Sequence, residues 1–129
     1  MATIERMITL NTDAQTAYDA ISSPVGMTKW FCDEAQVTDD GFSVAWKMEQ
    51  GSFGFAATIT ENEAGRVFAY RTIEDDATIT RFEITPQDKG CQVQVTEGDF
   101  ADTDAGKASM TEHENGWDFF LGRLQGLFV

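Results

Sequence analysis

The stretch Met110–Phe128, MTEHENGWDFFLGRLQGLF, decides the fold because it has the spacing of a single amphipathic helix. At about 100° per residue, its apolar side chains fall on one stripe centred on Trp117. The stripe consists of Met110, His113, Trp117, Phe120, Leu121, Leu124, Leu127 and Phe128. A helix of this length cannot bury such a stripe by itself, so the preceding chain must supply a broad apolar surface.

The segment from Ala35 to Glu97 has the alternation typical of an antiparallel meander. Turn-forming residues interrupt it at Asp39-Asp40-Gly41, Gln50-Gly51-Ser52, Glu63-Ala64-Gly65, Glu74-Asp75-Asp76 and Asp88-Lys89-Gly90. Between the turns, every second side chain is apolar, and many of these are rings. They are Phe42, Val44, Trp46, Met48, Phe53, Phe55, Phe68, Tyr70, Phe82, Ile84, Cys91, Val93 and Val95. The pattern predicts a sheet with one ring-rich face and one polar face covered by solvent.

The residues before the meander predict one strand and two short helices. Thr3 to Leu10 alternates as a strand does. Thr12 and Gln15 have the spacing of a capping box, which predicts a first short helix. Ser23 can cap a helix and Pro24 suits its first position, so the pair predicts a second short helix. We therefore predict an α+β fold, in which an antiparallel sheet of about six or seven strands wraps around the long C-terminal helix.

The composition describes a folded chain that carries a large negative charge. Residues 1–129, with 42% hydrophobic and 12% aromatic residues, are enough for one domain with its own core. The net charge of −13 would repel a phosphate backbone, and no Lys/Arg cluster interrupts it, so we expect neither nucleic acid nor anionic membrane as a partner. The acidity is explained either by solubility alone or by a cytoplasm of high salt concentration. The second explanation predicts that the folded protein becomes more stable as salt is added.

The sequence contains few features that indicate a cellular compartment, a metal site or catalysis. No apolar stretch approaches the length of a membrane span, so we expect a cytoplasmic protein in which Cys32 and Cys91 are free thiols. One histidine and two separated cysteines cannot make a usual zinc site, and we expect no metal, no cofactor and no standard catalytic motif. Most carboxylates lie in polar segments such as Asp99 to Gly106, which we expect to be a linker exposed to solvent. An enzyme would require buried polar groups converging near His113.

Four segments resemble a known superfamily. They are Trp30-Phe31 after a Pro-led turn, the run Gly54 to Phe68 that ends in Arg66-Val67-Phe68, the strand Phe82-Glu83-Ile84-Thr85-Pro86, and Asn115-Gly116-Trp117 followed by Phe120-Leu121 and Leu124. Their order and spacing are similar to those of the START-like, helix-grip (SRPBCC) superfamily, and within it to the branch of heat-shock-chaperone ATPase activator homologues. The resemblance covers nearly the whole chain.

The resemblance implies a seven-stranded sheet that grips the C-terminal helix around a hydrophobic cavity. Members of such families bind lipids, sterols, polyketides and other apolar molecules, some catalyse cyclisation or dehydration, and some contact chaperones. A small hydrophobic or amphipathic ligand is therefore the first hypothesis for this chain. The alternatives are a protein-interaction module of the chaperone-regulator kind and a cyclase- or hydrolase-like enzyme. The residues expected to bind the ligand are Trp30, Phe31, Trp46, Met48, Phe55, Tyr70, Phe82, Met110, His113 and Trp117.

The final helix also carries a strip that its apolar stripe does not explain. Phe119, Gly122 and Gly126 share one side, and an internal glycine costs up to about 1 kcal/mol of helix propensity relative to alanine. One hypothesis is that this strip packs on a second copy of the chain to form a symmetric dimer. The alternative is that it meets a loop or solvent.

Overall fold

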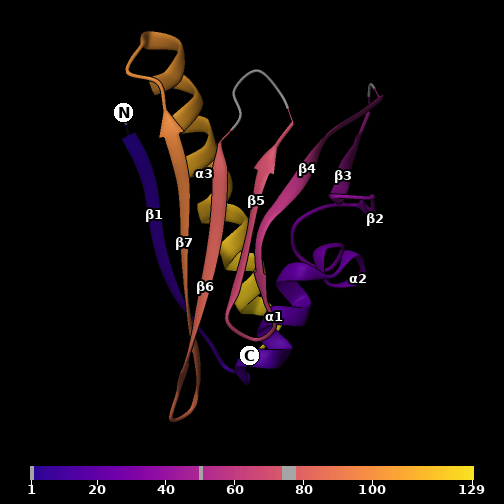
Figure 1. The fold of residues 1–129 in the computed structure, drawn as a ribbon, viewed down its shortest axis with the longest axis vertical. Helices are drawn as coiled ribbons and strands as arrows, with labels where there is room; N and C mark the ends of the chain where they lie inside the picture. The colour runs from indigo at the N-terminus through magenta and orange to yellow at the C-terminus, as the bar shows by residue number, and fades with distance from the viewer. Residues whose placement is uncertain (1, 50, 74–77) are drawn as a thin grey trace.

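A seven-stranded antiparallel sheet with one long helix across a face forms the body of the protein (Figure 1). The computed structural model describes residues 2–49, 51–73 and 78–129. The strands are β1 (Ala2–Leu10), β2 (Glu34–Val37), β3 (Gly41–Met48), β4 (Gly51–Glu63), β5 (Val67–Thr72), β6 (Ile79–Gln87) and β7 (Gly90–Phe100). The helices are α1 (Ala14–Ser22), α2 (Pro24–Met27) and α3 (Asp104–Gly126). The predicted α+β architecture is therefore confirmed.

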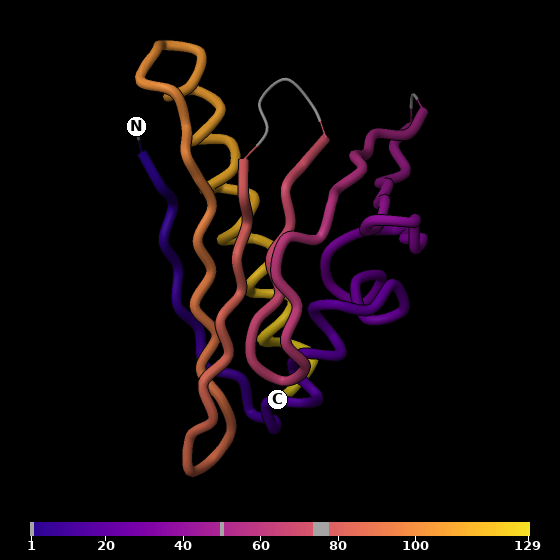
Figure 2. The backbone as a smooth tube through the Cα atoms, viewed as in Figure 1, coloured from indigo at the N-terminus to yellow at the C-terminus, as the bar shows by residue number. Residues whose placement is uncertain are grey.

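The order of strands in the sheet is β1-β7-β6-β5-β4-β3-β2. Figure 2 shows the path that produces it: the chain leaves β1, forms α1, which contacts β5, β6 and β7, and α2, which contacts β2, and then returns through β2 to β7 in sequence order. Strand β7 thus lies beside β1, and the rest is a meander, as predicted. The turns at residues 39–41, 63–65 and 88–90 connect neighbouring strands. The predicted turns at Gln50 and Glu74-Asp75-Asp76 include residues outside the described chain.

Helix α3 begins earlier than the sequence analysis predicted. It starts at Asp104 rather than Met110, and β7 continues to Phe100, so the expected linker from Asp99 to Gly106 is wrong. The hydroxyl of Thr103 caps the helix by accepting a hydrogen bond from the backbone N–H of Gly106 at 3.0 Å. Because a capping hydroxyl and an acidic first turn both stabilise a helix N-terminus, polar residues there belong to the helix.

The two short helices form where they were predicted, with one change of cap. Asp13, not Thr12, caps α1, and its carboxylate accepts a hydrogen bond from the backbone N–H of Thr16 at 2.7 Å. Ser23 caps α2 as predicted, and its hydroxyl accepts a hydrogen bond from the backbone N–H of Gly26 at 2.9 Å.

Ion pairs hold α3 against one edge of the sheet. Arg6 on β1 lies 2.8 Å from the carboxylate of Asp118 and 3.2 Å from that of Glu114, both on α3. The helix buries Trp117, Leu121 and Leu124 against the inward face of the sheet, whereas Leu127 and His113 of the predicted stripe stay partly exposed. Helix α3 contacts β1 and β7, and a cavity lies between its other flank and β3, β4 and β5.

Cys32 and Cys91 are buried free thiols, as predicted. Within residues 2–49, 51–73 and 78–129, no helix is long and apolar enough to cross a membrane.

Candidate ligand-binding cavity

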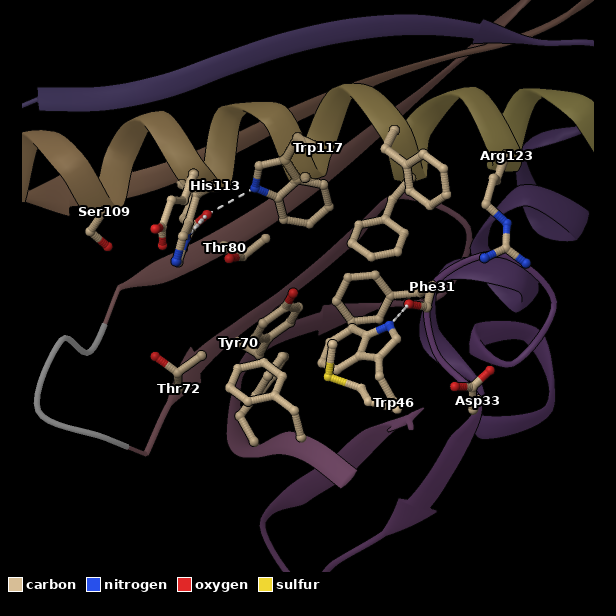
Figure 3. A pocket seen from close by; sticks show the side chains of 18 of the residues that line it. Phe31, Asp33, Trp46, Tyr70, Thr72, Thr80, Ser109, His113, Trp117 and Arg123 are labelled. Atoms are coloured by element: carbon tan, nitrogen blue, oxygen red, sulfur yellow. Dashed lines mark hydrogen bonds and ion pairs between the residues drawn. The ribbon is translucent and has the colours of Figure 1, made fainter. Parts of the chain in front are cut away.

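A cavity of about 690 Å³ lies between α3 and the inward face of β3 to β7 (Figure 3). This volume is typical of sites that hold small organic ligands, about 300–1,000 Å³. Rings and one thioether form a large part of its wall, namely Phe31, Trp46, Met48, Phe53, Phe55, Tyr70, Trp117, Phe119 and Phe120. The remaining wall is polar and includes Thr72, Thr80, Glu97, Ser109, Glu112 and His113, with Asp33, Lys47 and Arg123.

Phe31 organises the ring-lined part. Its ring centroid lies 5.2 Å from that of Trp46 and 5.2 Å from that of Phe120, and it stacks on Trp117 at 6.0 Å. The indole N–H of Trp46 donates a hydrogen bond to the backbone carbonyl of Phe31 at 2.6 Å. These contacts fix the rings on one side of the cavity, so that this wall is largely formed before any ligand enters.

A row of polar side chains crosses the sheet at the other end of the cavity. Tyr70 on β5 pairs with Thr80 on β6, which pairs in turn with Glu97 on β7. His113 lies above this row on α3 (Figure 3). All three strand residues are at most 4% exposed, so the row is a buried polar patch beside the cavity.

Glu97 is the centre of this patch because three side chains donate hydrogen bonds to it. The indole N–H of Trp117 lies 2.8 Å from one carboxylate oxygen, and the hydroxyl of Thr78 donates to the other. His113 Nδ1 lies 3.0 and 2.9 Å from the two oxygens. Burial by itself would raise the pKa of Glu97, but the bonds from His113, Thr78 and Trp117 outweigh it and hold that pKa below its ordinary value. Glu97 is therefore a buried, charged carboxylate.

Tyr70 stays protonated beside it. Burial, with a smaller contribution from the charge of Glu97, raises the pKa of the Tyr70 phenol, while a hydrogen bond with Thr80 acts in the opposite direction. The Tyr70 hydroxyl and the Glu97 carboxylate thus lie in one row on the sheet wall of the cavity, and the His113 imidazole lies on the α3 wall. Side chains of these types form hydrogen bonds with polar groups.

Residues 11–128 match the family described as Activator of Hsp90 ATPase homolog 1-like protein. The chain belongs to this family. No curated protein matches it.

Solved structures of low sequence identity share the fold of this family member. The protein MLL2253 from Mesorhizobium loti superposes with a TM-score of 0.81 at 14% identity, over 98% of this chain and 96% of that one. The AHSA1-like protein from Aeromonas hydrophila gives 0.78 at 17% identity, over 96% and 90% of the two chains. The Aha1 dimer from Colwellia psychrerythraea, solved in solution, gives 0.75 at 17% identity, over 97% and 94%. At such identities the likeness shows the fold alone.

In this family member, most of the ten predicted site residues line the cavity. Those that do are Phe31, Trp46, Met48, Phe55, Tyr70, His113 and Trp117. Trp30, Phe82 and Met110 do not. Trp30 is only 1% exposed and donates from its indole to the carbonyl of Ala20 at 2.8 Å, which makes it a core residue. Phe82 lies beneath Trp117 with ring centroids 5.7 Å apart, and Met110 packs against the core.

The polar patch around Glu97 was not predicted from the sequence. Glu97 appeared there only as the last residue of the predicted meander, with no role assigned to it. One signal was present: Cys91, Val93 and Val95 occupy the inward positions of β7, and Glu97 takes the next one. A carboxylate at an inward position of a strand breaks the apolar pattern of that face, and residues that break such a pattern are often found at functional sites.

The predicted dimer strip has two parts with different surroundings. Phe119 lines the mouth of the cavity, is 62% exposed, packs on Phe120 at 5.3 Å and lies under the guanidinium of Arg123 at 5.9 Å. Gly122 and Gly126 are exposed, and a methyl group added at either would meet nothing within 4 Å. Among the described residues, no group of three or more His, Cys, Asp and Glu side chains could hold a metal ion.

Proposed function

We propose that the cavity binds a small neutral amphipathic molecule with a ring-containing apolar body and one polar end. The observation that carries the proposal is the division of the cavity into a ring-lined part and a buried polar patch. An apolar body would contact Phe31, Trp46 and Phe120, and a hydroxyl or carbonyl would reach Tyr70 and His113. Groups that converge in this way fix the orientation of a ligand in addition to supplying affinity.

The mouth of the cavity supports the same proposal. Met48, Phe53 and Phe119 line it and are 66%, 63% and 62% exposed. Covering apolar surface is worth about 25 cal/mol per Å², so a ligand that reaches the mouth gains free energy from these side chains. The net charge of −13 disfavours an anionic ligand, and the ring-lined wall favours an uncharged apolar body, so the proposed class is neutral.

Two matched glycine substitutions on α3 test the proposal. Gly116 lines the cavity, and a methyl group there would meet only the Phe120 ring, at 3.9 Å. Gly116→Leu should therefore place a side chain that occupies part of the cavity, whereas Gly122→Leu adds the same side chain where a methyl group meets nothing within 4 Å. Both replace a glycine within the helix, so both should gain similar helix propensity, up to about 1 kcal/mol.

The readout is fluorescence titration with N-phenyl-1-naphthylamine, a neutral bicyclic probe. We expect saturable binding by the wild type and by Gly122→Leu, and at least about tenfold weaker binding by Gly116→Leu, equivalent to about 1.4 kcal/mol. Equal binding by both leucine variants would place the probe outside the cavity. Absence of saturable binding by the wild type would contradict the proposal.

A second candidate function is contact with another protein through the cavity mouth. The three exposed apolar side chains at the mouth favour it, since such side chains gathered together often mark an interface. A relative, the Aha1 of Colwellia psychrerythraea, is a dimer in solution, so a second copy of this chain is the partner to test. Sedimentation velocity of the wild type and Phe119→Ser at high micromolar concentration is the measurement, and a monomeric wild type would contradict this candidate.

The cytoplasmic compartment stays a prediction.

A further inference from the structure

The Glu97 carboxylate is hydrogen-bonded within the protein at both of its oxygens. Its Oε1 lies 2.8 Å from the indole nitrogen of Trp117 and 3.0 Å from His113 Nδ1. Its Oε2 accepts a hydrogen bond from the hydroxyl of Thr78 and lies 2.9 Å from His113 Nδ1. A carboxylate has about four lone-pair sites, two on each oxygen, so these contacts occupy both oxygens. Glu97 therefore anchors the polar patch and has little capacity left to accept a hydrogen bond from a ligand.

The hydroxyl of Tyr70, in the same row of the sheet, has a different role in its hydrogen bond. Burial raises the pKa of the Tyr70 phenol, so the hydroxyl keeps its proton, whereas the hydrogen bond with Thr80 acts to lower that pKa. A hydrogen bond lowers the pKa of a phenol when it is donated to the phenol oxygen, so Thr80 is the donor and Tyr70 the acceptor. The bond with Thr80 therefore does not use the proton of Tyr70, and the phenol can still donate.

Packing holds this donor in place at the cavity wall. Tyr70 lines the cavity, is 4% exposed and pairs with Thr80 across β5 and β6. Its ring stacks on that of Phe55 at 6.2 Å and meets that of Phe42 edge-to-face at 4.9 Å. Figure 3 shows the phenol rising from the sheet with its oxygen directed toward the side of the cavity where Thr80 lies. A donor whose position is fixed before a ligand enters loses little conformational entropy on binding.

We propose that Tyr70 is the residue that selects the polar end of the ligand, by donating a hydrogen bond to a carbonyl oxygen. This inference rests on the proposed binding function and narrows its ligand class to ring-containing carbonyl compounds. A carbonyl oxygen accepts a hydrogen bond and brings no proton of its own. A hydroxyl would bring a proton, and the carboxylate of Glu97, the strongest acceptor of the polar patch, already receives bonds at both oxygens. Thr80 acts as a positioning residue, because its bond to the phenol oxygen orients the Tyr70 hydroxyl.

Two nearly isosteric ligands test the inference. 2-Acetylnaphthalene has a C=O group where 2-isopropenylnaphthalene has C=CH₂, so the two differ in the acceptor oxygen. Their affinities are measured by displacement of N-phenyl-1-naphthylamine. We expect Tyr70→Phe to weaken binding of the ketone by at least about tenfold and to leave binding of the alkene within about twofold of the wild type. The matched control is Tyr18→Phe, which removes a phenol hydroxyl that donates to Asn62 outside the cavity lining and should change neither affinity.

Two further measurements test the direction of the hydrogen bonds. In infrared spectra, the carbonyl stretching band of bound 2-acetylnaphthalene should lie at a lower wavenumber in the wild type than in Tyr70→Phe, because a donated hydrogen bond weakens the C=O bond. Thr80→Val, which is close in shape, should weaken ketone binding by about two- to fivefold, because Tyr70 loses the bond that orients it. Stronger ketone binding by Thr80→Val would mean that Tyr70 had donated to Thr80, and would contradict the inference.

The outcomes separate this inference from the binding function. Ketone binding that is unchanged in Tyr70→Phe, or weakened no more than alkene binding, contradicts the role of Tyr70 alone, as does a carbonyl band at the same wavenumber in both proteins. A wild type that binds N-phenyl-1-naphthylamine but not the ketone also contradicts only this inference. A wild type that binds none of the three compounds contradicts the binding function and, with it, this inference. Urea unfolding of each variant confirms that folded proteins are compared.

Discussion

Replacing Glu97 with glutamine should destabilise the protein at neutral pH, although it is nearly isosteric. The carboxylate is 4% exposed and accepts hydrogen bonds from Trp117, Thr78 and His113. A hydrogen bond to a charged group is worth about 1.5–3 kcal/mol, against about 0.5–1.5 kcal/mol for a neutral one. We count the difference, about 1 kcal/mol, fully for the two buried donors and only in part for the half-exposed His113. The expected loss is about 2–3 kcal/mol of unfolding free energy.

The loss of unfolding free energy in Glu97→Gln should depend on pH, and the pKa of Glu97 gives the direction of that dependence. The hydrogen bonds hold the pKa of Glu97 below its ordinary value of 4.5. A carboxylate with a lowered folded-state pKa contributes stability above the unfolded-state pKa, and the contribution disappears as the pH falls through the folded-state pKa. The difference between the wild type and Glu97→Gln should therefore be largest near pH 7 and should shrink below about pH 4.5.

Urea denaturation, followed by tryptophan fluorescence and circular dichroism, measures both effects. Urea is preferable to guanidinium chloride because a salt would screen the self-repulsion of a chain with net charge −13. Glu5→Gln removes the same charge from an exposed position and corrects for relief of that repulsion. A Glu97→Gln variant as stable as Glu5→Gln at pH 7, or a stability difference that grows toward low pH, would refute the description of Glu97 as a charged, hydrogen-bonded carboxylate.

Three further predictions concern the core and the charge. Trp117→Ala should lose about 3–5 kcal/mol, whereas Trp117→Phe should lose only about 1–3 kcal/mol, because phenylalanine keeps much of the ring packing but lacks the N–H that bonds to Glu97; urea unfolding distinguishes them. Trp30→Phe should lower stability, by about 1–2 kcal/mol, through its lost bond to Ala20, and should leave N-phenyl-1-naphthylamine affinity unchanged, since Trp30 does not line the cavity; a weakened affinity would contradict this. The thermal midpoint should rise between low salt and molar NaCl as self-repulsion is screened, and a flat or falling midpoint in calorimetry would contradict it.

Periodicity predicted the architecture because it reports which face of each element is buried. The period-two pattern located the meander, and the stripe around Trp117 located α3. The start of α3 at Asp104 was missed because a capped, polar first turn looks like a loop when only apolar spacing is read. The alternation also placed Met48 and Phe53 on the inward face without showing that both would be largely exposed at the cavity mouth.

The site was harder to predict because it depends on contacts between residues distant in sequence. Glu97 and His113 meet only when α3 crosses β7, and Tyr70 joins them through strand pairing. Ring-rich composition predicted that Phe31 and Trp46 would lie on a wall, and they do. It could not separate them from Trp30, which is buried by α1 and α2, because neighbouring aromatic residues have the same local pattern. Cavity volume, likewise, follows from how side chains pack rather than from their order.

A crystal structure of the protein with 6-bromo-2-naphthol would test the binding proposal most directly. Anomalous scattering locates the bromine, and the electron density then orients the hydroxyl. The proposal predicts bromine in the ring-lined part of the cavity, near Phe31 and Trp46, with the hydroxyl within hydrogen-bond distance of His113 or Tyr70. Bromine only on the outer surface, or a naphthol oriented with its bromine against His113, would contradict it.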